Sequence, residues 1–235
     1  MEKKDIANRE IVAKGIRILV REGLIVNFGH ISFRPQGADW FWTLRHLHIG
    51  LESIGAADII ACDMEGHSVG TAWEASGERF IYTEIFARRP EIRAIAHFHP
   101  PMAIAFSVVG KPIVPVLMWA AALGDVPQYD SAEQIEKPRD GQALADALGE
   151  AKALVMQGHG AVTVGQSVKE VCGLAVLLEQ NARTQQLAST LGEPRLINFR
   201  GREKVFAPGF EEFCGVLWDH HQQTENSSFL SSFAV

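Results

Sequence analysis

The sequence has few cysteines, no cluster of basic residues and no long apolar run, and each shortage narrows its possible functions. Its three cysteines, Cys62, Cys172 and Cys214, are odd in number and widely spaced. This pattern favours reduced, mostly buried thiols in the cytoplasm over a disulfide framework. The formal net charge of -6 and the lack of a Lys/Arg run argue against a nucleic-acid partner. Without an apolar leader or eighteen uninterrupted apolar residues, we expect neither a signal peptide nor a membrane span.

What remains is the composition of an ordinary globular protein. The 235 residues are 47% hydrophobic and 21% charged, which is enough to form a sizeable core. No Gly/Ser-rich or Pro-rich linker divides the chain, and no internal repeat is evident. We therefore expect a single domain over 1–235, in which 222–235 form a polar C-terminal tail.

Hydrophobic spacing predicts alternating helices and strands, and hence an α/β fold. Several strands form hairpin-like pairs, so the sheet should be partly antiparallel. Ser76 is a plausible N-cap for the second helix. The predicted helices cover 6–23, 76–89, 102–109, 140–150 and 167–191. The predicted strands cover 29–34, 40–43, 58–63, 92–99, 153–156 and 161–164.

Two histidines end the strand at 92–99. His97 and His99 are two residues apart, so they should point to the same face of the sheet. Pro100 and Pro101 stop the strand immediately afterwards. Two neutral imidazoles at a sheet edge form half of a divalent-metal site. The alternative is one core histidine and one surface histidine.

A third histidine follows a later apolar run. His159 lies between Gly158 and Gly160, a pattern typical of a side chain exposed by a tight turn. Both histidine motifs lie where a hydrophobic strand meets a loop, and binding sites are often found at such positions. The two motifs together favour a metal site more than either one does alone.

Four motifs follow one another along the chain: Gly29-His-Ile-Ser-Phe-Arg34, Ser76-Gly-Glu78, His97-Phe-His99 and Gly158-His159-Gly160. In this order they resemble the class II aldolase/adducin family. The resemblance runs from about Ile6 to about Leu191. It implies a three-layer α/β/α fold with a central, largely antiparallel sheet, and a homotetramer with sites between subunits. It also implies one divalent metal per subunit, with zinc or manganese expected first, and with iron or cobalt also compatible with this ligand set.

By the same resemblance, His97, His99 and His159 are the metal ligands. Glu78 lies nineteen positions before the first of them, where the family has an acidic residue that serves as a further ligand and as the catalytic acid/base. The alternative for Glu78 is a first-turn glutamate that only complements the helix dipole. Three neutral histidines would leave the metal with its full charge and open positions for an oxygen substrate.

Departures from the family pattern make a phosphorylated sugar a less expected substrate. The sugar-phosphate aldolases usually have Asn after the glycine at position 29, and Ser-Ser before the acid. Here His30 follows Gly29, and Gly77 follows Ser76. A phosphate pocket needs several hydroxyl and backbone donors, and some of these are missing.

A basic segment takes the place of the phosphate loop. Arg45, His46 and His48 are candidate substrate-binding residues, because arginine forms bidentate contacts with carboxylates. The alternative is a solvated polar loop. An aromatic group of Phe28, Trp40 and Trp42 is predicted to line a flat pocket beside them.

The segment Phe28-Gly-His30 is similar to a branch of the family that decarboxylates hydroxylated aromatic acids, such as dihydroxyphthalate and hydroxypyridine-dicarboxylate. This similarity favours a metal-dependent lyase that acts on an ortho-hydroxy aromatic or heteroaromatic dicarboxylate, with Glu78 or His30 as the acid that reprotonates the product. Three alternatives stay open: retro-aldol cleavage of a hydroxy-ketone or sugar phosphate, a non-catalytic adducin-like interaction domain, and iron-dependent oxygenation.

Overall fold

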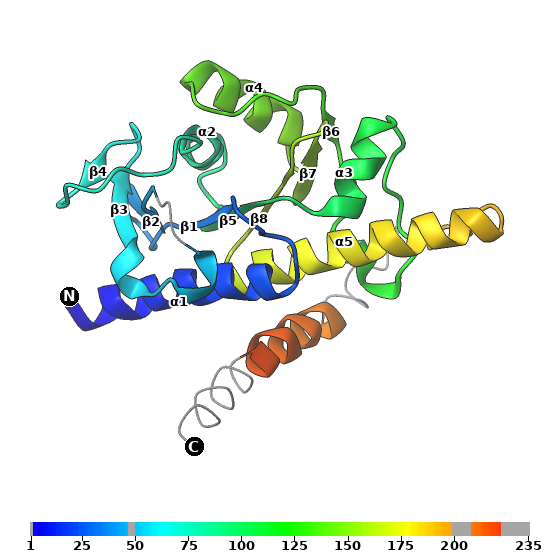
Figure 1. Cartoon of the computed structure of the whole chain (residues 1–235), viewed down its shortest axis with the longest axis horizontal. Helices are drawn as coiled ribbons and strands as arrows, with labels where there is room; N and C mark the ends of the chain where they lie inside the picture. Colours follow the sequence, from blue (N-terminus) through cyan, green and yellow to red (C-terminus); the bar gives the residue numbers. More distant parts are fainter. Residues whose placement is uncertain (1, 47–49, 199–207, 222–235) are drawn as a thin grey trace.

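One mixed sheet of eight strands forms the centre of the molecule (Figure 1). The computed structural model describes residues 2–46, 50–198 and 208–221. Within these ranges the strand order is β4-β3-β2-β1-β5-β8-β7-β6, and every neighbouring pair is antiparallel except β6 with β7. The strands are β1 (His30–Phe33), β2 (Trp40–Leu44), β3 (Ile59–Asp63), β4 (Ser68–Val69), β5 (Ala94–Phe98), β6 (Gln128–Tyr129), β7 (Ala153–Met156) and β8 (Ala161–Gly165).

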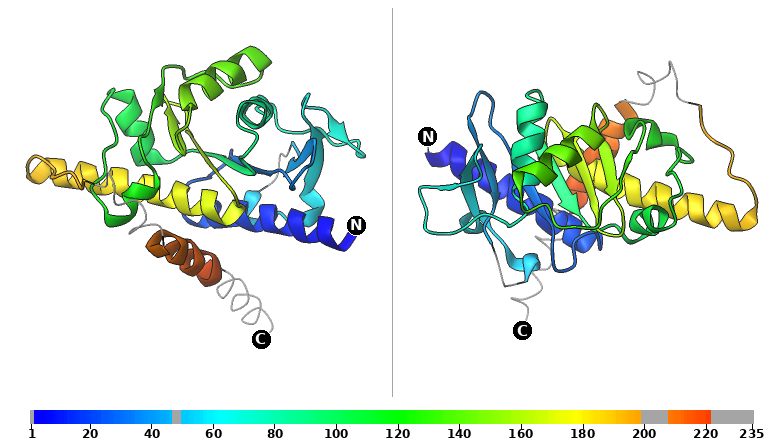
Figure 2. Two further views of the ribbon diagram at one scale, coloured as in Figure 1. Left: turned by 180° about the vertical axis from the view of Figure 1, so that it is seen from behind. Right: turned by 90° about the horizontal axis from the view of Figure 1, so that it is seen from above.

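Helices cover both faces of this sheet (Figure 2). Helices α2 and α4 pack on one face, whereas α1, α3 and α5 pack on the other, and a helix at 208–221 packs against α5. The predicted three-layer α/β/α fold with a largely antiparallel sheet is therefore confirmed. The helices are α1 (Glu2–Arg21), α2 (Phe80–Arg88), α3 (Pro101–Val108), α4 (Pro138–Leu148) and α5 (Val168–Leu191), with short 3-10 turns at Leu51–Ser53, Ala56–Asp58 and Met118–Ala122.

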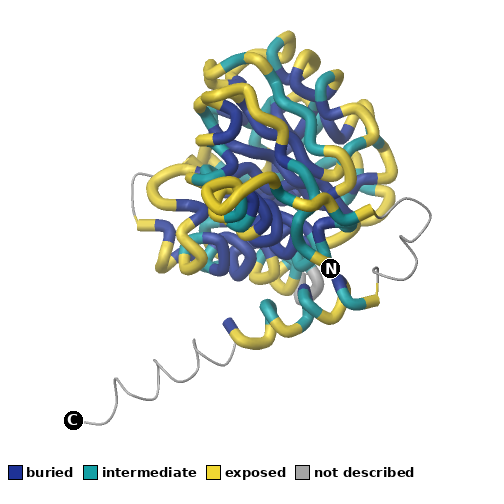
Figure 3. The backbone as a smooth tube through the Cα atoms, turned by 90° about the vertical axis from the view of Figure 1, so that its right-hand side faces the viewer, coloured by how far each residue is buried: buried dark blue, intermediate teal, exposed yellow. Residues whose placement is uncertain are grey.

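Alternation along the buried strands decides which face carries each side chain. In β5, Ala94, Ala96 and Phe98 contribute to the core beneath α1 and α5, while Ile95 contributes to the core beneath α2 and α4. Figure 3 shows these central strands as buried. His97 follows the alternation of Ile95, so its ring lies on the α2 and α4 side of the sheet.

The second helix begins later than its apolar spacing suggests. It starts at Phe80, after a turn in which the Arg79 amide donates to the Ser76 carbonyl over 3.1 Å. No side chain caps this helix, so the prediction that Ser76 is its N-cap is wrong. The Ser76 hydroxyl contacts His30 instead, because the turn brings it against the end of β1.

Polar side chains of α5 hold the segments that follow the histidine strand. The carboxylate of Glu179 accepts hydrogen bonds from the Met102 and Ala103 amides, at the start of α3. These amides would otherwise lack partners, because the first amides of a helix have no intrahelical acceptor. Helix α5 thereby fixes the chain directly after the His97 strand.

The helix at 208–221 was not predicted, although it covers part of the core. Its Phe210 and Cys214 are buried against α5. All three cysteines are free and buried, as predicted, and burial raises the pKa of Cys62 and Cys214 to about 12. In the described ranges no helix is both long and apolar enough to span a bilayer. The predicted tail at 222–235 lies outside the described residues.

Candidate metal centre

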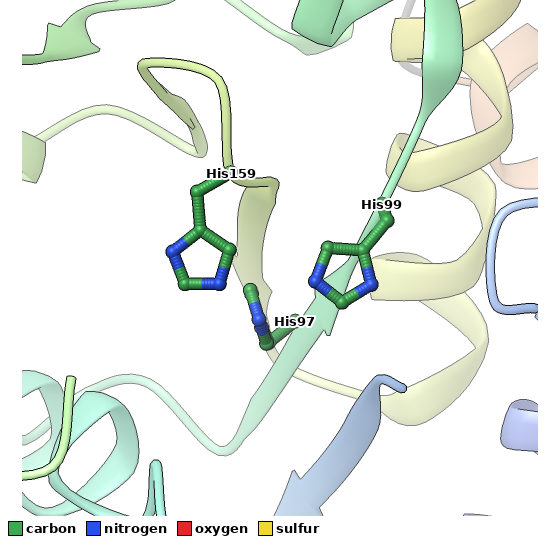
Figure 4. A group of neighbouring side chains, drawn as sticks. All are labelled: His97, His99 and His159. Atoms are coloured by element: carbon green, nitrogen blue, oxygen red, sulfur yellow. The ribbon is translucent and has the colours of Figure 1, made fainter. Parts of the chain in front are cut away.

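Three histidines from two separate segments converge at one end of the sheet (Figure 4). His97 is the penultimate residue of β5, His99 directly follows the strand, and His159 lies in the turn between β7 and β8. One ring nitrogen from each histidine lies within 4.8 Å of the other two. The ring centroid of His97 is 4.9 Å from that of His99 and 5.2 Å from that of His159. The structure thus brings together the three residues that the sequence predicted as ligands.

Backbone carbonyls orient all three rings in the same way. The Nδ1 atom of His97 lies 3.1 Å from the Ala161 carbonyl. For His99 the partner is the Phe28 carbonyl at 2.9 Å, and for His159 it is the Glu133 carbonyl at 3.2 Å. A carbonyl only accepts, so each Nδ1 carries a proton, and Nε2 is the ring nitrogen that remains to bind a cation. This arrangement is typical of histidines that bind a metal.

Two glycines allow the third histidine to approach the other two. Gly158 has φ +63, in the left-handed region that favours glycine, so the turn can place His159 above the sheet. A Cβ on Gly160 would lie 2.7 Å from the Phe98 carbonyl oxygen and 3.0 Å from Cε1 of His97. A larger residue at position 160 would therefore separate the two histidine-bearing segments.

Glu78 lies against this cluster, just before α2. Its Oε2 is 3.3 Å from Nε2 of His97, and its Oε1 is 3.4 Å from Nε2 of His159. The Ile135 amide donates to Oε1 over 3.3 Å and helps to fix the carboxylate. Burial alone would raise the pKa of Glu78, but the contact with His97 outweighs burial and holds it well below its usual range. The carboxyl group is therefore ionised at neutral pH.

His99 and His159 are neutral at neutral pH. Burial, reinforced by the neighbouring His97, lowers the pKa of His99 to about 4 and also lowers the pKa of His159. Only the neutral ring can offer its lone pair to a cation. The cluster therefore needs no proton loss from His99 or His159 before a metal binds at neutral pH.

His30 lies beside the cluster but does not share its geometry. It pairs with His97 across β1 and β5, and the two ring centroids are 5.6 Å apart. Its Nε2 is 2.8 Å from the Ser76 hydroxyl, and its Nδ1 is 2.7 Å from the Tyr82 hydroxyl. Burial lowers the pKa of His30 to about 3. Sequence reasoning missed the pairing of His30 with Ser76 and Tyr82, because these residues are 46 and 52 positions away.

The structure describes two of the three predicted substrate-binding residues, Arg45 and His46. Arg45 follows β2, and its Nη2 donates to Asp58 Oδ1 over 2.8 Å while its guanidinium stacks on Trp73 at 4.2 Å. An isolated antiparallel bridge pairs Arg45 with Ala75, the residue before Ser76. His46 is exposed. His48 lies outside the described residues.

The predicted aromatic pocket does not form. Trp40 and Trp42 pack against each other at 4.7 Å, but they belong to the core beneath α1. That core lies on the face of the sheet opposite His97, whereas Phe28 is exposed beside His99. The prediction failed because residues 40 and 42 of a strand lie on the same face of the sheet. That face packs against α1, so both tryptophans are part of the core there.

The donor set fits a divalent cation. The Nε2 atom of His97 is buried and has no hydrogen-bond partner among the described residues, which is costly unless something else occupies its lone pair. Three nitrogens bound to one ion would each lie at about 2.0–2.1 Å from it. The three histidines offer ring nitrogens within 4.8 Å of one another, close enough to share one ion. Three protein ligands would leave a divalent cation with open coordination positions, and Glu78 lies against the same cluster.

Comparison with known proteins identifies the family. The model of the class II aldolase and adducin N-terminal domain matches residues 10–186. A 3,4-dihydroxyphthalate decarboxylase of Rhodococcus jostii is 28% identical over 94% of this chain and 97% of its own length. Decarboxylase tropJ of Talaromyces stipitatus is 28% identical over 75% of this chain and 74% of its own length.

A solved structure has the same fold. The L-fuculose 1-phosphate aldolase of Glaciozyma antarctica superposes with a TM-score of 0.82 at 23% identity, over 96% of this chain and 92% of that one. At this identity the match concerns the fold alone. The family model spans most of the chain, from α1 to α5, and includes all three histidines. This chain belongs to the class II aldolase and adducin family.

Proposed function

We propose that this protein is a metal-dependent carbon–carbon lyase that decarboxylates an ortho-hydroxy aromatic or heteroaromatic dicarboxylate. The observation that carries the proposal is the convergence of one ring nitrogen from each of three histidines within 4.8 Å, with the Glu78 carboxylate against Nε2 of His97 and of His159. The similarity to 3,4-dihydroxyphthalate decarboxylases over nearly the whole chain supports carbon dioxide as the leaving group.

The three histidines would hold the cation through Nε2, while their Nδ1–H groups continue to donate to the carbonyls of Ala161, Phe28 and Glu133. When bound, a divalent cation supplies positive charge that withdraws electrons from the carbon left by carbon dioxide. The metal identity stays a prediction, with zinc or manganese expected first and iron or cobalt also compatible.

Glu78 would move one proton twice. Because its carboxyl group is ionised at neutral pH, it can first accept the proton of the substrate's ring hydroxyl. The bond between the ring carbon and the carboxylate carbon then breaks, carbon dioxide leaves, and the electron pair stays on the ring carbon. Glu78 returns its proton to that carbon. The ring oxygen regains a proton from water after release.

Arg45 is our proposed contact for the second carboxylate of the substrate. Its Nε and Nη2 both contact Asp58 Oδ1, and among the described residues Nη1 has no such partner. Arg45→Lys is expected to raise the KM for a dicarboxylate about tenfold, because lysine lacks the planar fork. The matched control is the KM for an ortho-hydroxy monocarboxylate, which should not change. An equal change for both substrates would contradict a carboxylate contact.

Product identity tests the proposed reaction. The purified protein, loaded separately with manganese and with zinc, is incubated with 3,4-dihydroxyphthalate and with L-fuculose 1-phosphate. We expect carbon dioxide from the first compound and no aldehyde from the second. Aldehyde release from the sugar phosphate without carbon dioxide from the aromatic acid would replace the decarboxylase proposal with the retro-aldol alternative.

Metal analysis and oxygen consumption address the remaining alternatives. An adducin-like interaction domain would bind well under about half an equivalent of metal after dialysis and reloading. An oxygenase would contain iron and consume oxygen with the aromatic substrate. The homotetramer and the cytoplasmic location stay predictions, and light scattering of the metal-loaded protein would test the former.

A further inference from the structure

A closed hydrogen-bond network links His30 to the backbone of Glu78. His30 is 8% exposed and Tyr82 is 0% exposed. The Ser76 hydroxyl lies 2.8 Å from Nε2 of His30 and also accepts the Glu78 amide proton over 3.3 Å. The Tyr82 hydroxyl lies 2.7 Å from Nδ1 of His30 and donates to the His30 carbonyl over 3.2 Å. The network therefore joins β1, the turn before α2, and α2 itself.

Two tautomers of a neutral His30 fit these distances, because the Tyr82 hydroxyl can donate either to Nδ1 or to the carbonyl of His30. If it donates to Nδ1, Nε2–H of His30 donates to the Ser76 hydroxyl, whose own proton then has no acceptor among the described contacts. If it donates to the carbonyl, it accepts from Nδ1–H of His30, and this arrangement gives every proton of the network an acceptor. Nε2 of His30 is then an acceptor and takes the proton of the Ser76 hydroxyl. A second proton on His30 would put a positive charge beside the ring of His97, where it would repel a cation bound by the three histidines.

We propose that His30 is a positioning residue: it acts on Glu78 through the Ser76 hydroxyl, and His30 itself exchanges no proton with the substrate. This inference rests on the proposed function, in which Glu78 is the residue that moves the proton. His30 fixes the direction of the Ser76 hydroxyl, and Ser76 fixes the amide of Glu78. The Ile135 amide holds the other end of the same residue at Oε1.

The geometry leaves His30 no proton to give. Its one N–H points at Tyr82, which is fully buried in the core beneath α2 and α4. Donation to a substrate at the histidine cluster would require the ring to break its bonds with both Ser76 and Tyr82. Glu78, in contrast, already places both carboxylate oxygens at the cluster.

Two amide substitutions of His30 separate positioning from proton donation. In His30→Gln the side-chain amide reaches the place of Nε2 and can accept from Ser76, whereas in His30→Asn it reaches only the place of Nδ1. Neither amide is an acid or base at neutral pH. We expect His30→Gln to keep kcat within about tenfold, and His30→Asn to lose about 100-fold, because misplacing a reacting group by an ångström costs about that much.

A proton-donating His30 gives a different result. In that case His30→Gln would lose as much turnover as His30→Asn and Glu78→Gln, and this outcome would overturn the proposal. A second pair of variants tests the same link from the other side. Ser76→Ala should lower kcat with little change in metal content, and Ser76→Thr, which keeps the hydroxyl, should recover most of it. Equal activity of the two Ser76 variants would also overturn the proposal.

Thr163→Val is the matched control for loss of a buried hydroxyl. Thr163 is fully buried in β8, and its hydroxyl donates to the Val171 carbonyl, away from the network. We expect this variant to keep the wild-type kcat. Circular dichroism of each variant establishes that it has folded before its kcat is compared.

The tautomer of His30 provides a readout that needs no substrate. Two-bond ¹H–¹⁵N correlation spectra of the histidine-labelled full chain should show its proton on Nδ1 at neutral pH. A proton on Nε2 would overturn the arrangement even if the enzyme works as proposed. Conversely, full activity of Glu78→Gln would refute the proposed role of Glu78. The tautomer of His30 would still test the hydrogen-bond network, because that measurement does not depend on the role of Glu78.

Discussion

Replacing His97 by alanine is expected to abolish metal retention and turnover together. His97 is fully buried, and its ring lies next to those of both His99 and His159. Its loss leaves two nitrogens in place of three, and the cavity that remains cannot supply the missing ligand. Metal content after gel filtration and the rate of carbon dioxide release from 3,4-dihydroxyphthalate should both fall below about 1% of wild type, beyond the 10–100-fold typical of losing only an outer partner of a ligand.

His67→Ala is the matched control for this substitution. His67 lies in the turn between β3 and β4, and its side chain is 78% exposed. It should keep wild-type metal content and turnover. A folded His97→Ala protein that is free of metal but still active would refute the idea that the cation withdraws charge from the breaking bond.

Glu78→Gln is expected to separate metal binding from chemistry. The amide has nearly the shape of the carboxylate, so the three histidines and the metal content should be unchanged. It cannot accept the hydroxyl proton or return it to the ring carbon. The expected loss in kcat is about 10²–10⁴-fold, the usual contribution of a positioned acid/base, measured as carbon dioxide release from the manganese-loaded and the zinc-loaded variant.

Glu91→Gln offers a control with the same change of charge. Its carboxylate pairs with Arg89 at the surface, and its side chain is 54% exposed. We expect no change in kcat for this variant. If Glu78→Gln instead lost its metal, Glu78 would be a necessary ligand, and the assignment of the proton transfers to it would lose its support.

Local patterns predicted most of the fold and the centre of the site. The strand at His97 could be read from its apolar run and its two prolines, and the turn at His159 from its glycines. Both signals concern residues next to one another in the sequence. The expectation that these histidines converge came from the family resemblance. In the structure, the antiparallel pairing of β5 with β8 brings the two segments together.

What escaped prediction depends on contacts between distant segments or on very short elements. Strands β4 and β6 have two residues each, which is too few to show a period. The carbonyl of Glu133 and the hydroxyls of Ser76 and Tyr82 become partners of histidines only after the chain has folded.

The helix at 208–221 is a different case, because its signal was present in the sequence. Apolar residues recur there with helical spacing after a proline that suits a helix start. They are Phe210, Phe213, Cys214, Leu217 and Trp218.

Anomalous diffraction from crystals grown with zinc or manganese tests the central claim most directly. We predict one strong peak per chain, bonded to Nε2 of His97, His99 and His159 at about 2.0–2.2 Å, with Glu78 beside it. A stoichiometric metal that bound elsewhere, with the three imidazoles left apart, would contradict the account.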